Sequence, residues 1–332
     1  MTEANPRTVK KTMLAIRIGK VTPARDARLA EVPVPETRDG WIRIKVRGIG
    51  LNHSEQVLRL GEVERDYIAK PVIPGIECVG EVDDPGTADL KVGQRVCALM
   101  GGMGRSFDGS YAEYALVPAR HVFALPPAAD DLPWETLAAI PETFFTAWGS
   151  LFECLHLEGG DTLLVRGGTS ALGYAAIQTA HALGCRTIAT ARHEEGLELL
   201  MSLGCDRALV DDGNLSEKGI DADKALELVG PSTLRDSLKA VRRGGIVCDA
   251  GILGGAELLQ GFDPITEIPN GVFLTGFYSN YPDQGTITDI FEFIAYHGIE
   301  PVIAARFGFD DLAKAIALQD RGGFHGKIVV TR

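Results

Sequence analysis

The chain has 332 residues, of which 45% are hydrophobic and 23% are charged, and its formal net charge is −12. This composition is typical of a globular chain long enough for two domains, and no Lys/Arg-rich run indicates a nucleic acid or an anionic membrane as a partner. No apolar run is long enough to span a bilayer, and the N-terminus lacks the apolar core of a signal peptide. The six cysteines form no Cys-x-x-Cys pair, so we expect free thiols and a cytoplasmic protein.

The first third of the chain has the pattern of short strands separated by turns. Gly and Pro interrupt stretches of β-forming residues at 13–18, 41–46, 78–82, 93–99 and 109–114. Many short strands with frequent turns predict a small barrel-like domain.

The rest of the chain has a different pattern. Residues 135–151 are rich in alanine and other apolar residues and predict a helix. Short apolar strands then alternate with helices, which is the pattern of a doubly wound parallel sheet; they are expected at 161–166, 186–192, 207–210, 224–229, 245–250 and 272–277. The tail predicts two helices and a last strand at 326–331 that returns to the first domain. The sequence therefore predicts an α/β protein, with a β-rich domain made of residues 1–133 and 281–332 around a doubly wound domain of residues 134–280.

The most informative stretch is a glycine-rich turn between an expected strand and an expected helix. Gly167 and Gly168 allow a tight turn, and Gly173 lets the helix pack close to the strand. The intervening residues are Thr169, Ser170, Ala171 and Leu172. Such a turn directs backbone N–H groups and a helix dipole at one point, which suits a pyrophosphate and makes a dinucleotide the leading candidate ligand.

The turn departs from the usual fingerprint, because Ser170 stands where the central glycine is expected. A tight βα turn without any ligand is therefore an open alternative. No Gly-Lys-Ser/Thr follows, which excludes a P-loop, and Ser170 lacks the glycine two residues later that a nucleophile elbow needs.

The end of the next strand bears on the choice of cofactor. A site that prefers NAD usually has an acid there, whereas this chain has Thr190, Ala191, Arg192 and His193. A guanidinium binds phosphate in a bidentate fork, so Arg192 favours the 2′-phosphate of NADP, and NADPH over NADH. A solvated surface arginine is the alternative.

Stretches along almost the full length, in order, resemble the medium-chain dehydrogenase/reductase superfamily, and within it the zinc-free quinone oxidoreductase (zeta-crystallin-like) branch. The matching stretches are 48–55, 72–82, 92–96, 109–118, 146–148, 167–173, 244–251 and 326–327. The resemblance implies a GroES-like catalytic domain built from both chain ends, an inserted Rossmann domain and an active site in the cleft between them. It also implies a homodimer that extends the Rossmann sheet at an edge near 272–277.

The resemblance also bears on metal binding. Zinc members use a Cys, a His-Glu pair and a later Cys or His, and the corresponding positions here look like Asn52, Ile76-Glu77 and Glu142. One or two carboxylates make a poor zinc site, and the four-cysteine lobe of the zinc enzymes is missing, so we expect no metal.

The resemblance implies catalytic roles for a few residues. Asn52 would hydrogen-bond the nicotinamide ribose, the carboxamide or the substrate carbonyl, with a loop-capping Asn as the alternative. Ser54 would relay a proton and His53 would supply one, or both are simply loop residues. Thr146 would touch the nicotinamide face, or it is an ordinary helix threonine.

Further cofactor contacts are implied elsewhere. Gly251, Ile252 and Leu253 would bring backbone to the carboxamide. Lys327 would reach the cofactor phosphates, or it is a surface lysine. Many branch members carry a lysine for the 2′-phosphate where this chain has Gly196, which leaves Arg192, Thr190 and His193 for that role.

Without a Lewis acid, hydride transfer to a quinone or an α,β-unsaturated carbonyl is favoured over an alcohol–ketone reaction. The expected protein is thus a zinc-independent, NADPH-dependent reductase whose partner is a small quinone or enone. The alternatives are a metal-free alcohol/ketone dehydrogenase and an NADPH-binding protein with little turnover. The loop 100–109 is expected to be flexible and to form a substrate wall or lid.

Overall fold

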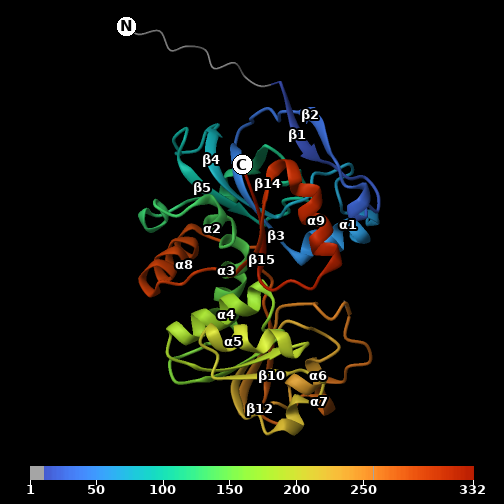
Figure 1. Ribbon diagram of the computed structural model, residues 1–332, viewed down its shortest axis with the longest axis vertical. Helices are drawn as coiled ribbons and strands as arrows, with labels where there is room; N and C mark the ends of the chain where they lie inside the picture. Colours follow the sequence, from blue (N-terminus) through green and yellow to red (C-terminus); the bar gives the residue numbers. More distant parts are fainter. Residues whose placement is uncertain (1–10, 257) are drawn as a thin grey trace. The chain divides into compact units, whose positions relative to one another are not determined.

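The computed structural model describes residues 11–256 and 258–332 (Figure 1). The chain divides into two compact units. Unit 1 comprises Met1–Ala124, Phe307–Gly322 and Val329–Arg332, and unit 2 comprises Leu125–Arg306 and Gly323–Ile328. These divisions lie at other positions than the predicted boundaries at 133/134 and 280/281, since the segment 281–306 clusters with unit 2.

The β-rich part contains a two-stranded and a seven-stranded sheet. The hairpin pairs β1 (Thr12–Ile16) antiparallel with β2 (Leu29–Pro33). The larger sheet has the order β14-β15-β3-β4-β5-β7, with β6 paired to β3. Its strands are β3 (Trp41–Leu51), β4 (Glu77–Asp84), β5 (Arg95–Leu99), β6 (Tyr114–Pro118), β7 (Val122–Ala124), β14 (Ile303–Gly308) and β15 (Lys327–Thr331). The last strand lies beside β3, so the chain end joins the sheet of the first domain as expected.

Alternating burial along β3 explains the position of this sheet. Ile42, Ile44 and Val46 are buried, whereas the residues between them are half-buried. This period of two directs one face of the strand into the core. The helices α1 (His53–Leu60) and α9 (Leu312–Arg321) contact each other in the same unit.

Unit 2 contains a six-stranded parallel sheet with the order β10-β9-β8-β11-β12-β13. The strands are β8 (Thr162–Arg166), β9 (Arg186–Ala191), β10 (Arg207–Val210), β11 (Ala222–Glu227), β12 (Val241–Asp249) and β13 (Phe273–Gly276). Its helices are α2 (Trp134–Ala138), α3 (Pro141–Trp148), α4 (Ala171–Ala182), α5 (Leu197–Ser202), α6 (Leu234–Ser237), α7 (Pro264–Glu267) and α8 (Gln284–His297). The parallel order confirms the doubly wound fold, and the strand order reverses between β8 and β11, where such folds bind ligands.

Two predicted elements were wrong in detail. The stretch 109–113 is a loop with a single bridge at Ala112, and the strand begins only at Tyr114. The helix expected over 135–151 is broken at Pro141, because proline lacks the N–H that a continuing helix needs; it ends in a π-helical segment, Gly149–Cys154. The strands β2, β7 and β14 were not predicted.

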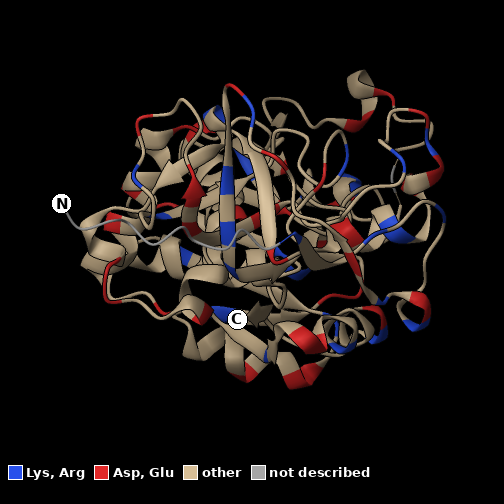
Figure 2. Cartoon of the chain, turned by 90° about the horizontal axis from the view of Figure 1, so that it is seen from above, with Lys and Arg blue, Asp and Glu red and all other residues tan. Residues whose placement is uncertain are grey.

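The distribution of charge agrees with the composition. Figure 2 shows Lys and Arg interspersed with Asp and Glu. Among the described residues, no helix is long and apolar enough to cross a membrane. All six cysteines are free thiols, and every one except Cys154 is buried.

Candidate dinucleotide-binding and catalytic site

The glycine turn has the geometry that close approach to a phosphate group requires. Gly167 follows β8 with φ +84°, a conformation that favours glycine. A Cβ on Gly173 would lie 2.5 Å from the Gly168 carbonyl oxygen, so only glycine allows α4 to pack this close to the turn. The first-turn N–H groups of this 12-residue helix face the turn, which is the arrangement that binds a pyrophosphate.

Ser170 has a structural role that its departure from the fingerprint did not predict. It is the N-cap of α4: its Oγ accepts a hydrogen bond from the Gly173 N–H at 3.0 Å and donates one to the Gly167 carbonyl oxygen at 3.0 Å. The serine therefore fixes the shape of the turn from within.

The residues at the end of β9 divide into a buried and an exposed group. Thr190 is 1% exposed, and its Oγ1 accepts a hydrogen bond from the Gly167 N–H at 3.1 Å. Arg192 and His193 are exposed. Gly196 is buried, and a Cβ there would lie 2.7 Å from Cγ2 of Thr169 in the glycine turn. This contact explains why a longer side chain does not fit at Gly196.

Gly251, Ile252 and Leu253 extend the line of β12 beside the end of β11. The Leu253 N–H donates to the Leu228 carbonyl at 3.0 Å. Gly251 and Ile252 are half-buried, and Leu253 is 37% exposed. A Cβ on Gly230 would lie 2.5 Å from the Gly251 carbonyl oxygen, so the two backbones touch. The backbone that follows β12 is thus packed against the end of β11.

Helix α3 holds Thr146 and contacts Lys327. Thr146 is 5% exposed and donates from Oγ1 to Oε1 of Glu142 at 2.8 Å. Lys327 is 3% exposed, and its Nζ donates to Oγ1 of Thr143 at 2.8 Å. The surface-lysine alternative is therefore wrong: Lys327 is anchored inside unit 2.

Asn52 caps helix α1. Its backbone N–H donates to Oε2 of Glu55 at 2.7 Å, and its side chain completes a capping box. Its Nδ2 also donates to Oε1 of Glu77 at 2.8 Å. Gln319 on α9 donates to the Asn52 carbonyl at 2.7 Å. The capping alternative is thus realised, and it holds the amide in a fixed place beside a buried carboxylate.

The two residues that follow Asn52 differ in exposure. His53 is exposed, with Nδ1 at 2.9 Å from Oε1 of Gln56. Ser54 is half-buried, and its Oγ accepts a hydrogen bond from Arg105 at 2.9 Å. Asn52, His53 and Ser54 belong to unit 1, whereas Thr146, the glycine turn and the other predicted cofactor contacts belong to unit 2.

The positions that would hold a metal carry few ligands. Within the described part of the chain, no group of three or more His, Cys, Asp or Glu side chains could hold a metal ion. Glu77 is 1% exposed, and the side chain of its neighbour Ile76 has no atom that can bind a metal ion. An amide, an isoleucine and a carboxylate are a poor donor set for zinc.

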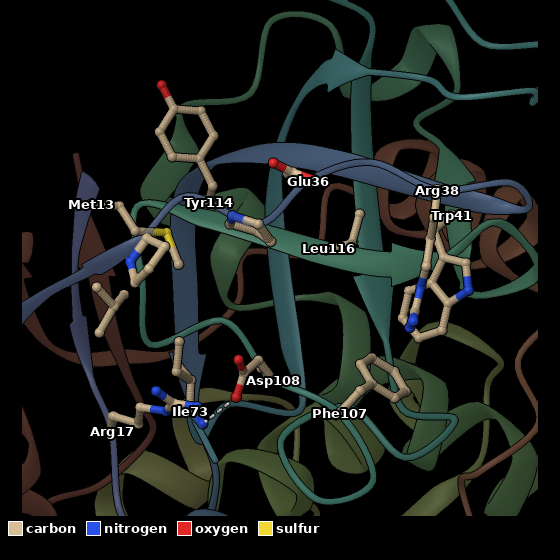
Figure 3. A pocket seen from close by; sticks show the side chains of 14 residues that line it. Met13, Arg17, Glu36, Arg38, Trp41, Ile73, Phe107, Asp108, Tyr114 and Leu116 are labelled. Atoms are coloured by element: carbon tan, nitrogen blue, oxygen red, sulfur yellow. Dashed lines mark hydrogen bonds between the residues drawn. The ribbon is translucent and has the colours of Figure 1, made fainter. Parts of the chain in front are cut away.

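The loop 100–109 is anchored to unit 1. Met103 is 1% exposed, and Arg105 forms an ion pair of 2.7 Å with Glu62. Phe107 and Asp108 line a separate cavity of about 400 Å³ (Figure 3). In this cavity, Cζ of Arg38 lies 3.8 Å from the centroid of the Trp41 ring. Asp108 accepts a hydrogen bond from the Ile73 N–H at 2.8 Å. None of the predicted site residues lines the cavity.

A buried ionic cluster beneath the glycine turn was missed by the sequence analysis. Arg166, the last residue of β8, is fully buried and pairs with Asp211 and Asp236. The sequence carried only one signal of this cluster. It is an arginine directly before the glycines, together with Asp211-Asp212 after a later strand.

The comparisons with known proteins agree with this architecture. Residues 38–127 match the alcohol dehydrogenase GroES-like domain, and residues 171–295 match the family described as zinc-binding dehydrogenase. The quinone oxidoreductase of Pongo abelii is 30% identical over 76% of this chain and 77% of its own length. A solved NAD-dependent alcohol dehydrogenase has a TM-score of 0.83 at 25% identity and covers 96% of this chain and 100% of its own. The quinone oxidoreductase of Coxiella burnetii has a TM-score of 0.84 at 21% identity, covering 97% of this chain and 100% of its own.

The fold and the glycine turn thus define an oxidoreductase that binds a nicotinamide dinucleotide. The chain belongs to the medium-chain dehydrogenase/reductase superfamily and, within it, to the quinone oxidoreductase branch.

Proposed function

We propose that this protein is a zinc-independent, NADPH-dependent reductase that transfers a hydride to a quinone or to the β-carbon of an α,β-unsaturated carbonyl. The observation that carries the proposal is the hydrogen bond of 2.8 Å between Asn52 and Glu77. These residues stand at the positions where zinc relatives carry a thiolate and a His-Glu pair. Such a site holds an amide–carboxylate pair in place of a Lewis acid. A conjugated acceptor needs only polarisation at its carbonyl oxygen and a proton.

The choice of NADPH over NADH rests on the end of β9. Strand β9 ends without a carboxylate of its own, and Arg192 is exposed there. The guanidinium is free to form a bidentate pair with a 2′-phosphate.

The residues would divide the work between binding and proton transfer. The bound nicotinamide supplies the hydride. The α4 N-terminus holds the pyrophosphate, and Arg192 holds the 2′-phosphate. Thr146 and the backbone of Gly251 to Leu253 orient the nicotinamide ring. Exposed His53 or solvent delivers the proton, with Ser54 as a relay.

One alternative has support of its own. The 25% identity to an NAD-dependent alcohol dehydrogenase favours a metal-free alcohol/ketone dehydrogenase as the second candidate. The third candidate, an NADPH-binding protein with little turnover, would bind cofactor and reduce no acceptor.

We also propose a cytoplasmic homodimer that forms through β13. This strand is at the edge of the parallel sheet, and its Phe273 side chain is 60% exposed. An open edge with an exposed aromatic side chain suits pairing with a second copy.

Cofactor binding by two matched arginine variants tests the proposal. Arg192 follows the carboxyl end of β9, and exposed Arg186 starts the same strand at its other end. We expect Arg192→Ala to weaken NADPH binding about tenfold or more while it leaves NADH binding unchanged. Arg186→Ala should bind both cofactors like the wild type. Equal NADPH affinity in Arg192→Ala and the wild type would contradict the phosphate role.

A further inference from the structure

The buried guanidinium beneath the glycine turn has no role in the chemistry described above. Arg166 is 0% exposed, and its Nε and Nη2 donate to Oδ2 and Oδ1 of Asp211 at 2.7 and 2.8 Å. Its Nη1 donates to Oδ2 of Asp236 at 2.8 Å. A bidentate pair of this kind fixes both position and charge.

Asp211 lies next to the strand end that selects the cofactor. It follows β10, which pairs parallel with β9, and its N–H donates to the Ala191 carbonyl at 2.9 Å. Its backbone therefore adjoins the last residue of β9, one position before Arg192, and its carboxylate contacts the Thr190 hydroxyl of the same strand. Its side chain is 13% exposed. A carboxylate near this point favours a ribose 2′-hydroxyl and repels a 2′-phosphate, which carries close to two negative charges.

The same carboxylate is connected to the glycine turn. Thr190 Oγ1 donates to Oδ2 of Asp211 at 3.4 Å and accepts from the Gly167 N–H at 3.1 Å. Among the described residues, the remaining donor to the Asp211 carboxylate is the Gly213 N–H at 2.9 Å. Arg166 is thus the only full positive charge among these donors to Asp211, and the other donors are neutral.

The other acids of the cluster have further donors of their own, although Asp236 also accepts from Nη1 of Arg166. Asp236 accepts hydrogen bonds from the Leu215 N–H at 2.8 Å and from the Ser216 hydroxyl at 2.6 Å. Glu227, which ends β11, is 0% exposed and accepts from the Val229 and Gly230 N–H groups at 2.8 and 3.0 Å. Asp211 therefore has fewer donors besides Arg166 than either of these acids has.

We infer that Arg166 is a specificity-determining positioning residue: by neutralising Asp211, it lets the end of β9 accept the 2′-phosphate of NADP. It acts through Asp211 and touches no cofactor atom itself. The inference rests on the proposed cofactor site, and it assigns the balance between NADPH and NADH to a buried pair instead of to Arg192 alone.

Two variants with opposite expected effects test the inference. The measured quantity is the ratio of the dissociation constants for NADPH and NADH, from fluorescence titration of the full-length protein at low ionic strength. Arg166→Met leaves Asp211 without its cation, so the ratio should rise about threefold or more. Asp211→Asn removes the negative charge, so the ratio should fall by a similar factor.

Further variants separate this role from a purely structural one. The double variant Arg166→Met/Asp211→Asn should return the ratio towards that of the wild type. Asp206→Asn removes the same charge before the other end of β10 and should leave the ratio unchanged. The inference would be overturned if Arg166→Met and Asp211→Asn weakened the binding of NADPH and NADH equally, so that the ratio of the two dissociation constants stayed constant.

The variant Asp211→Asn still tests the inference if Arg166→Met does not fold or if Arg192 does not contact the phosphate. If Arg166→Met does not fold, Asp211→Asn alone decides, since it removes a charge and keeps the shape of the side chain. If Arg192→Ala has no effect on NADPH binding, the proposed phosphate contact fails. The shift of the ratio in Asp211→Asn still supports or overturns the Arg166 role in that case.

Discussion

Asn52 and Glu77 are joined by a hydrogen bond of 2.8 Å between the amide Nδ2 and the carboxylate Oε1. The same amide caps helix α1. Glu77 is 1% exposed, so its carboxylate depends on protein donors for its solvation. The Asn52 side chain therefore both caps the start of a helix and donates a hydrogen bond to a buried carboxylate.

This relationship predicts that Asn52→Ala destabilises the fold. The variant loses the N-cap and one donor to a buried carboxylate, and we expect a loss of about 2 kcal/mol in the free energy of unfolding. Urea denaturation measures it. His53→Ala, at the exposed next residue, is the control and should cost less than about 0.5 kcal/mol. Equal stability of Asn52→Ala and His53→Ala would show that the hydrogen bonds of Asn52 contribute nothing.

Gly196 should be required for the shape of the glycine turn. A Cβ at this position would lie 2.7 Å from Cγ2 of Thr169 and 3.2 Å from Cβ of Ala191. Gly196→Ala therefore displaces Thr169, and we expect NADPH binding to weaken by about 1 kcal/mol, which is roughly fivefold.

Gly308→Ala is the matched control for this change. Gly308 has no atom within 4 Å of a Cβ position, so its substitution should leave the dissociation constant unaltered. Isothermal titration of both variants makes the comparison. Wild-type affinity in Gly196→Ala would mean that the turn tolerates movement of Thr169.

Asp249, at the end of β12, predicts a pH dependence of stability. Burial raises the pKa of this carboxyl above its ordinary 3.8, and a hydrogen bond from the Gly251 N–H offsets part of the rise. The folded state thus holds the proton to a higher pH than the unfolded state does. Between the unfolded and the folded pKa, stability falls as the pH rises, and above the folded pKa the loss is complete.

Replacement of this carboxyl by an amide should abolish that loss. We expect the difference in unfolding free energy between Asp249→Asn and the wild type to become more favourable to the variant from pH 4 to pH 7. Urea denaturation at several pH values measures the difference. A constant difference across this range would mean that Asp249 titrates alike in both states.

The sequence predicted the parallel sheet more accurately than the β-rich part. Strand 207–210 coincides with β10, since it is a short apolar run between turns. Strand β2 (Leu29–Pro33) escaped because it lies in a hairpin at the edge, is half-exposed and contains a proline and a glutamate. Glu113 falls in the loop before β6 because its carboxylate accepts the Leu14 N–H at 2.9 Å, a contact 99 residues apart in sequence.

The candidate site was predictable where a short motif sets its geometry. The positive φ of Gly167 and the close packing of Gly173 follow from the spacing of the glycines. The bond between Arg166 and Asp211 joins residues 45 apart. No local pattern reports such a contact, because it depends on the order of the strands. For the same reason, the sequence did not reveal that Lys327 is anchored to Thr143.

The most direct test of the proposed function is turnover by the purified, chelator-treated protein with NADPH or NADH and a panel of quinones and enones. We expect NADPH oxidation that survives chelation, does not increase when zinc is added and is faster than NADH oxidation at equal cofactor concentration. Activity that returns only with added zinc would contradict the metal-independent chemistry. Tight cofactor binding without turnover of any acceptor would contradict the reductase assignment.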